Sequence, residues 1–289
     1  PMHYTAPEGS YASDASDGAV RVREFRAMVQ ALHAAGLRVG MDVVYNHTYA
    51  SGQDPRSVLD RIVPGYYHRL DAKGAVTRST CCENTATENT MMAKLMIDSA
   101  VTWARDYRID SFRFDLMGHQ PRAAMEQLQR AVDAAAGRRV LLVGEGWNFG
   151  EVADGARFVQ ASQRSLGGSG IGSFSDRARD AVRGGGCCDG PADVLQRQGW
   201  LNGLHYARNP HAAAAGTGSR EELLRDTQPR EGRAQSGEEL HVLVPGRGVE
   251  RRYGYRVKSL LVADVAGADD LAAPVLDRVV AGVEGRAEH

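Results

Sequence analysis

The chain has 289 residues, of which 43% are hydrophobic and 25% are charged, and this balance excludes a mainly disordered protein. Its 35 basic and 36 acidic side chains give a formal net charge of −1. This charge gives no reason to expect binding to nucleic acid or to an anionic membrane. No apolar run reaches the ~18 residues of a membrane helix, and the first residues identify no compartment.

A helix followed by a buried strand is predicted three times along the chain. The predicted pairs are a helix over 20–35 with a strand over 39–45, a helix over 92–103 with a strand over 109–115, and a helix over 124–135 with a strand over 139–145. Each helix shows apolar residues at a spacing of three or four, and each strand is nearly continuous in apolar residues. This alternation predicts a parallel sheet that is buried on both faces.

Polar residues stand at the ends of all three predicted strands. They are Asp42, Asn46 and His47, then Arg113 and Asp115, and finally Glu145 and Trp147. In a (β/α)8 barrel the carboxyl ends of the strands meet at one mouth, so side chains far apart in sequence come together there. A doubly wound sheet also places sites at carboxyl ends, but no GxGxxG follows a strand here. We therefore predict an α/β fold, a (β/α)8 TIM barrel.

The connection from Thr48 to Thr87 is about forty residues long, far longer than the usual βα loop of ~2–6 residues, and is predicted to be functional. Beyond Gly184 the pattern weakens. The later expectations are loops at 184–186 and 212–216, a short helix capped by Ser219, a strand over 255–265 and a helix over 271–283.

The four cysteines form two adjacent pairs, Cys81-Cys82 and Cys187-Cys188. Neighbouring Cα atoms lie ~3.8 Å apart, closer than disulfides prefer. The pairs also lack the CxxC spacing of zinc sites. The pattern therefore predicts neither a disulfide framework nor a zinc site.

Two carboxylates at the strand ends have the chemistry of an acid and a nucleophile. Arg113 and Asp115 share one face of their strand, so the guanidinium can orient an ionised carboxylate, although a structural ion pair is an equal alternative. Glu145 would be half-desolvated, as a general acid requires, or else solvated at the strand terminus. Two such groups at one mouth suit a retaining glycosidase, which holds them ~5–5.5 Å apart.

Neighbouring side chains fit a sugar site. Trp147, next to Glu145, offers an apolar plane for a sugar ring, with a buried packing role as the alternative. Asn46 and His47 can hydrogen-bond sugar hydroxyls, although a histidine at a strand end is usually a packing residue.

Three runs at these strand ends resemble signature regions of the α-amylase superfamily, specifically of its pullulanase and limit-dextrinase branch. The runs are MDVVYNHT at 41–48, FRFDLMGH at 112–119 and VGEGW at 143–147, and the phrases at 3–11, 63–69 and 79–89 resemble the same branch. The match implies that residues 1–204 are the central part of a (β/α)8 glycosidase catalytic domain. Residues 205–289 form a divergent C-terminal region of uncertain fold.

The resemblance implies a retaining glycoside hydrolase that cleaves α-1,6-glucosidic links of pullulan, starch or limit dextrins through a covalent glycosyl-enzyme. Asp115 matches the nucleophile and Glu145 the acid/base. Arg113 matches the residue that orients the nucleophile, and Asp42 matches a structural aspartate near it. The implied reaction is a double displacement with retention.

The resemblance also implies how the sugar is held. His47 matches a histidine at the cleavage subsite, and Trp147 and His119 match positions on the aglycone side. The pair Cys81-Cys82 lies in a matched phrase. The resemblance therefore favours a role in the pocket wall or in packing over a redox role. The implied partner is an α-glucan, with no nucleic acid and no membrane. The chemistry requires no cofactor and no metal ligand is predicted, while a structural calcium ion has no supporting motif.

One expected feature is missing. The resemblance implies a His-Asp pair after a later strand, whose aspartate stabilises the oxocarbenium-like transition state, and the sequence has no His-Asp dipeptide. In the related barrels two strands would precede Pro1 and further strands would follow the matched region. We therefore expect an incomplete barrel, with the first two and last strands lacking or divergent.

Three alternatives stay open. A glucan-binding pseudoenzyme or an inactive fragment would keep the sugar pocket without the stabilising aspartate. Another enzyme of the superfamily would act on α-1,4 links. A metal-dependent barrel hydrolase would use Asp42, His47, Asp115, His119 and Glu145, but these include no HxH pair, and Arg113 would repel a cation.

Overall fold

The computed structural model describes residues 3–186, 189–204 and 207–215. The strands are β1 (Gly40–Val43), β2 (His47–Thr48), β3 (Glu83–Asn84), β4 (Ser111–Phe114), β5 (Leu141–Gly144) and β6 (Gly172–Ser173). The α-helices are α1 (Gly18–Ala34), α2 (Leu59–Ile62), α3 (Thr90–Asp106), α4 (Arg122–Ala136), α5 (Asp176–Arg183), α6 (Pro191–Gln196) and α7 (Pro210–Ala214). The short 3-10 helices are η1 (Gly9–Tyr11), η2 (Met117–His119), η3 (Gly150–Gly155) and η4 (Trp200–Asn202).

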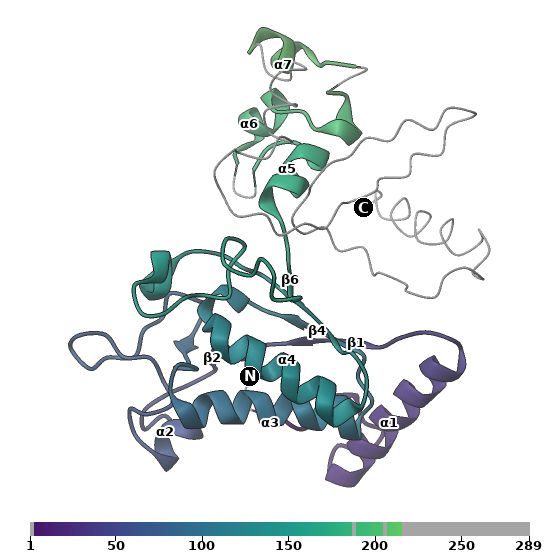
Figure 1. Cartoon of the computed structure of the whole chain (residues 1–289), viewed down its shortest axis with the longest axis vertical. Helices are drawn as coiled ribbons and strands as arrows, with labels where there is room; N and C mark the ends of the chain where they lie inside the picture. Colours follow the sequence, from purple (N-terminus) through teal and green to yellow (C-terminus); the bar gives the residue numbers. More distant parts are fainter. Residues whose placement is uncertain (1–2, 187–188, 205–206, 216–289) are drawn as a thin grey trace.

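Strands β1, β4, β5 and β6 form a parallel sheet in the same order as they occur along the chain. The register pairs Asp42 with Arg113 and Arg113 with Val143. A sequential order is that of a barrel wall, whereas a doubly wound sheet reverses direction at its switch point. Among the described residues the sheet is open rather than a closed eight-stranded barrel (Figure 1). The predicted parallel α/β architecture is thus confirmed.

The three predicted helix and strand pairs are present as α1 with β1, α3 with β4, and α4 with β5. Each of the three strands has four residues, fewer than predicted. Gly36 follows the end of helix α1 by two residues, and Gly137 directly follows the last residue of α4. Both glycines have positive φ angles, 78° and 66°, which residues with a side chain rarely adopt.

The core lies between the sheet and helices α3 and α4, which pack against each other (Figure 1). Met96, Ala100 and Trp103 are buried along one face of α3, as their spacing predicts. Phe112 and Phe114 of β4 point into the same core and are at most 1% exposed. Since side chains alternate along a strand, Arg113 and Asp115 take the opposite face of the sheet.

The long connection 48–87 is held by a buried arginine. The side chain of Arg69 is 0% exposed and pairs with Glu88 at 2.8 Å and with Glu151 of η3 at 3.0 Å. Its Nη2 also donates to the backbone oxygen of His119 at 3.0 Å. These contacts fasten the connection to the loops that follow β4 and β5.

The carboxylate of Glu151 accepts hydrogen bonds from several side chains besides Arg69. Thr77 Oγ1 and Asn84 Nδ2 donate to its Oε1 at 3.0 and 2.9 Å, and Ser79 donates to its Oε2. Burial alone would raise the pKa of Glu151, but the hydrogen bonds from Ser79 and Asn84 and the contact with Arg69 outweigh burial and lower the pKa to about 2.

This shift predicts acid sensitivity. The pKa of Glu151 lies below its ordinary value of 4.5 in the folded protein, so its stabilising contribution is complete above that value and is lost as the pH falls toward 2. We expect Glu151→Gln to melt well below the wild type at about pH 7 and to approach it at about pH 3. Melting temperatures across this range test the prediction, and a gap between the two proteins that stays constant with pH would contradict it.

Beyond β5 the structure departs from the predicted alternation. The connection from β5 to β6 contains η3 but no α-helix, and α5, α6 and α7 follow beyond the sheet (Figure 1). The expected loop at 212–216 is wrong in part, because α7 reaches Ala214. Its start is explained by Pro210 in the first turn and by the side chain of Asn209, which accepts from the Ala212 N–H at 2.9 Å.

Several later expectations lie outside the described residues: the helix capped by Ser219, the strand over 255–265, the helix over 271–283 and the pair Cys187-Cys188. The boundary near residue 204 stays a prediction for the same reason. In the part of the chain that the structure describes, no helix combines the length and the apolar character needed to cross a membrane.

Candidate active site

One guanidinium joins three carboxylates at the carboxyl ends of β1, β4 and β5. Arg113 Nη1 lies 2.8 Å from Asp42 Oδ1 and 3.2 Å from Asp115 Oδ1, and its Nη2 lies 2.6 Å from Glu145 Oε1. Partial burial acts to lower the pKa of Arg113, but the three carboxylates outweigh it and raise the pKa. The structure thus brings together the four predicted residues that carry charge.

Asp115 is held through both of its carboxylate oxygens. Arg113 binds Oδ1, and the side-chain amide of Asn46 donates to Oδ2 at 2.9 Å and to the Asp115 backbone oxygen at 2.8 Å. Asn46 is only 1% exposed, so it positions Asp115 from below the surface. It does not face a sugar, as its position at a strand end had suggested. The side chain of Asp115 remains 25% exposed and therefore accessible.

Glu145 is held at the turn that follows β4. Its Oε2 accepts from the backbone N–H of Leu116 at 3.0 Å, while Oε1 pairs with Arg113. Leu116 has φ 41° and ψ 48°, a left-handed conformation that costs a residue with a side chain roughly 1–2 kcal/mol. This strained residue directly follows Asp115 and aims its N–H at the second carboxylate, so the backbone itself links the two predicted catalytic groups.

Trp147 is half-buried beside Glu145, and the guanidinium carbon of Arg179 lies 6.0 Å from its ring centre. Its backbone packs directly on Gly118. A methyl group at Gly118 would lie 2.1 Å from the Trp147 carbonyl oxygen, so only glycine fits at this position. The partial exposure of Trp147 agrees with either reading from the sequence, and its contact with sugar stays a prediction.

His119 is not brought to the carboxylate cluster. It is 1% exposed, its ring packs 4.6 Å from that of Phe149, and its Nε2 lies 3.1 Å from Ser79 Oγ. Burial lowers the pKa of His119 to about 4, which keeps the ring neutral at neutral pH. The structure gives His119 a packing role. An effect of His119 on the aglycone side, as the resemblance implies, would have to act through the loop that His119 supports.

His47 reaches the cluster through Asn46. Its Nδ1 lies 2.6 Å from Asn46 Oδ1, and Asn46 in turn contacts Asp115. Burial lowers the pKa of His47 and outweighs the opposing attraction of Asp115. The other ring nitrogen, Nε2, faces Cys81 Sγ at 3.4 Å.

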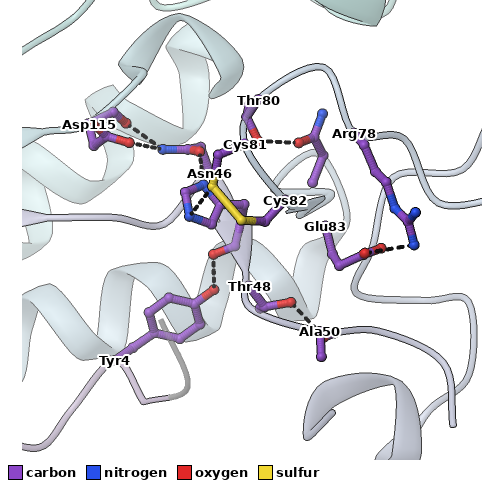
Figure 2. The surroundings of a disulfide bond; sticks show 12 residues. Tyr4, Asn46, Thr48, Ala50, Arg78, Thr80, Cys81, Cys82, Glu83 and Asp115 are labelled. Atoms are coloured by element: carbon purple, nitrogen blue, oxygen red, sulfur yellow. Dashed lines mark hydrogen bonds and ion pairs between the residues drawn. A yellow bond between two sulfur atoms is a disulfide. The ribbon is translucent and has the colours of Figure 1, made fainter. Parts of the chain in front are cut away.

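The prediction that adjacent cysteines would not pair is wrong. Cys81 and Cys82 are joined by a disulfide with a Cα separation of 3.8 Å, and the bond lies next to Asn46 (Figure 2). The usual Cα spacing describes bridges between separate segments, whereas this bond closes a small ring through one peptide bond. The expectation that this pair forms part of a pocket wall stays a prediction.

The metal-hydrolase alternative gains no support from this geometry. Its five proposed ligands do not converge within the described residues, because His119 is buried elsewhere and Arg113 occupies the space between the three carboxylates. A guanidinium in that position excludes a cation shared by the same groups.

Two contributions to the site were missed from the sequence. Arg69 and Glu151 fix the walls around the site, but each is a single charged residue in a predicted loop, without a pattern that marks burial. The role of Asn46 could have been found from its place between a strand end and His47, since a buried amide there must find partners.

No family model matches the chain. Among curated proteins, pullulanase 1 of Arabidopsis thaliana chloroplasts is 48% identical over 219 residues, which is 73% of this chain and 22% of the relative. A pullulanase of Klebsiella aerogenes is 50% identical over 212 residues, or 72% of this chain and 19% of the relative. The chain therefore spans about a fifth of the length of these relatives.

The fold has similar solved structures. A crystal structure described as Klebsiella pneumoniae pullulanase complexed with maltotriose superposes with a TM-score of 0.65 and 50% identity. The match covers 69% of this chain and 19% of that chain. Sequence and structure thus both relate this chain to pullulanases.

Proposed function

Because the chain is homologous to a segment of the pullulanases and so belongs to this family of glycoside hydrolases, we propose that it carries the catalytic carboxylates of a debranching enzyme acting on α-1,6 links of α-glucans. The observation that carries the proposal is the pair Asp115 and Glu145 on one guanidinium at the ends of neighbouring strands. The related pullulanase complexed with maltotriose supports an α-glucan oligosaccharide as ligand.

In the proposed reaction Asp115 attacks the anomeric carbon while Glu145 gives a proton to the departing glycosidic oxygen. A covalent glycosyl-enzyme forms, and Glu145 then takes a proton from the water that hydrolyses it. Two inversions at the same carbon give net retention. Arg113 and Asn46 hold one oxygen of Asp115 each, which fixes the direction of attack.

Glu145 would have to change partners to act as an acid. Both of its oxygens accept from donors in the structure, Oε1 from Arg113 and Oε2 from the Leu116 N–H. An oxygen that carries the transferable proton must face the glycosidic oxygen instead, so we infer that the side chain turns when substrate binds. This chemistry needs no cofactor, because the two carboxylates supply the nucleophile and the proton.

A second candidate is a glucan-binding pseudoenzyme. The observation that favours it is the missing His-Asp pair, since the loss of one transition-state contact costs several kcal/mol of barrier. The two candidates share the same binding site and differ only in turnover.

The deciding experiment compares the full chain on pullulan, which contains α-1,6 links, and on amylose, which has only α-1,4 links. We expect new reducing ends from pullulan and none from amylose, with retention in the first product observed by NMR. Binding is measured separately by the slower migration of the protein in a gel that contains pullulan. Binding without release would contradict turnover by this chain, as a pseudoenzyme or an inactive fragment would behave, and release from amylose would establish the α-1,4-acting alternative.

A further inference from the structure

The Cys81–Cys82 disulfide stands against a histidine of the proposed active site. The two cysteines directly precede β3, and β3 pairs with β2 so that Asn84 lies opposite His47. This pairing sets Cys81 Sγ 3.4 Å from His47 Nε2. Cys81 is exposed and Cys82 half-buried, so a reductant in solution can reach the bond.

The ring of His47 is oriented by a chain of hydrogen bonds. The Asn46 amide nitrogen donates to Asp115, so its oxygen is the atom that faces His47 Nδ1 at 2.6 Å. That oxygen only accepts, which places the proton of His47 on Nδ1. In the neutral ring the lone pair is then on Nε2, directed at the sulfur atoms. Metal-binding histidines are fixed in the same way, by an acceptor on their other nitrogen.

The distances already suit a common ion. One ligand atom from each of His47, Cys81 and Cys82 can be chosen so that all three lie within 4.8 Å of one another. A tetrahedral zinc ion, about 2.3 Å from sulfur and about 2.0 Å from nitrogen, holds such atoms about 3.5 Å apart. The observed 3.4 Å between Cys81 Sγ and His47 Nε2 is close to this value.

We propose that reduction of the Cys81–Cys82 disulfide creates a binding site for Zn²⁺ or a similar thiophilic divalent cation, with two cysteine thiolates and His47 Nε2 as ligands. A dithiol such as dithiothreitol supplies the two electrons and two protons that convert the disulfide into two thiols, and is itself oxidised to a disulfide. Binding of the ion then releases two protons from these thiols. Breaking the S–S bond also frees the sulfurs to separate to the distance that one ion requires. A fourth position stays open to water.

The site would control catalysis through His47. This consequence rests on the proposed function and on the sequence resemblance, which implies that His47 contacts the sugar at the cleavage subsite. A bound ion occupies His47 Nε2 and adds positive charge beside the Asn46 and Asp115 contacts. The oxidised chain is then open to sugar, and the reduced chain loses activity only when the metal is present.

Cobalt offers a direct optical test, because thiolate ligands give Co²⁺ intense charge-transfer absorption. The working protein is the full chain with Cys187→Ser and Cys188→Ser, which leaves a single cysteine pair. It is reduced with dithiothreitol, freed of reductant without oxygen and titrated with Co²⁺. We expect a thiolate-to-cobalt band that saturates at one equivalent and is displaced by Zn²⁺. The oxidised protein should show no such band.

Single variants identify the ligands. Cys82→Ser, at a half-buried position, should remove most of the band, and His47→Gln should weaken Co²⁺ binding at least about tenfold. His211→Gln, at an exposed position of α7, is the matched control and should bind as the parent does. The proposal would be overturned if the reduced protein showed no band, or if its binding of Co²⁺ were unchanged by Cys82→Ser and His47→Gln. The optical result does not depend on pullulan hydrolysis, so a failure of the proposed function is recognised separately.

Discussion

Replacement of Asp115 by asparagine is expected to lower pullulan hydrolysis by roughly three orders of magnitude or more, with glucan binding retained. An amide has nearly the shape of the carboxylate but cannot form the glycosyl ester. Both oxygens of Asp115 accept from neighbouring donors, and the single oxygen of the amide can keep only one of these two contacts. Initial rates and migration in pullulan gels measure the two effects on the same preparations. Asp98→Asn, on the exposed face of α3, is the matched control.

A glycosyl fluoride separates the nucleophile from the acid. Fluoride leaves without help from a proton, so Glu145→Gln should still release fluoride from an α-maltosyl fluoride in a first turnover, whereas Asp115→Asn should not. Equal release by both variants would show that the assignment of the two carboxylates is wrong.

Replacement of Arg69 by methionine is expected to give the largest loss of stability, about 3–5 kcal/mol. The arginine side chain is fully buried, and its removal leaves the carboxylate of Glu151, only 14% exposed, without its counter-charge. Glu88 loses its two hydrogen bonds at 2.9 and 2.8 Å as well. Because methionine retains much of the volume, the loss reports charge rather than a cavity.

Urea denaturation followed by circular dichroism measures this loss, provided that the slope of the transition stays unchanged. Arg56→Met is the matched control, since Arg56 also pairs with a carboxylate but lies on the surface. If both variants unfold at the same urea concentration, the buried network does not hold the connection 48–87 in place.

The sequence predicted the elements that bury a regular apolar pattern. Helix α3 shows Met92, Met96, Ala100 and Trp103 on one face, and β4 alternates Phe112 and Phe114 with polar residues, so periodicity alone located both. The connection 48–87 and the segment with α5 to α7 have no such period. Their short elements depend on long-range contacts, such as that of Arg69 with Glu151, which no local pattern contains.

The candidate site was also predicted only in part. The polar strand ends correctly suggested that Asp42, Arg113, Asp115 and Glu145 meet, because parallel strands bring their carboxyl ends to one edge. The left-handed Leu116 could not be foreseen, since leucine does not favour that conformation. Nor could the bond between Cys81 and Cys82, because the general spacing of disulfides argues against it.

The meeting of three carboxylates on the single guanidinium of Arg113 has a consequence for the choice of polysaccharide. In the proposed reaction Glu145 carries the proton that it donates, so the carboxylates of Asp42 and Asp115 leave the cluster with one negative charge in excess of the Arg113 guanidinium. A neutral glucan that becomes positive at its reacting carbon reduces this imbalance, while a phosphate or sulfate ester on the sugar increases it. We therefore expect anionic polysaccharides to be rejected by repulsion alone, before the shape of the pocket discriminates between them.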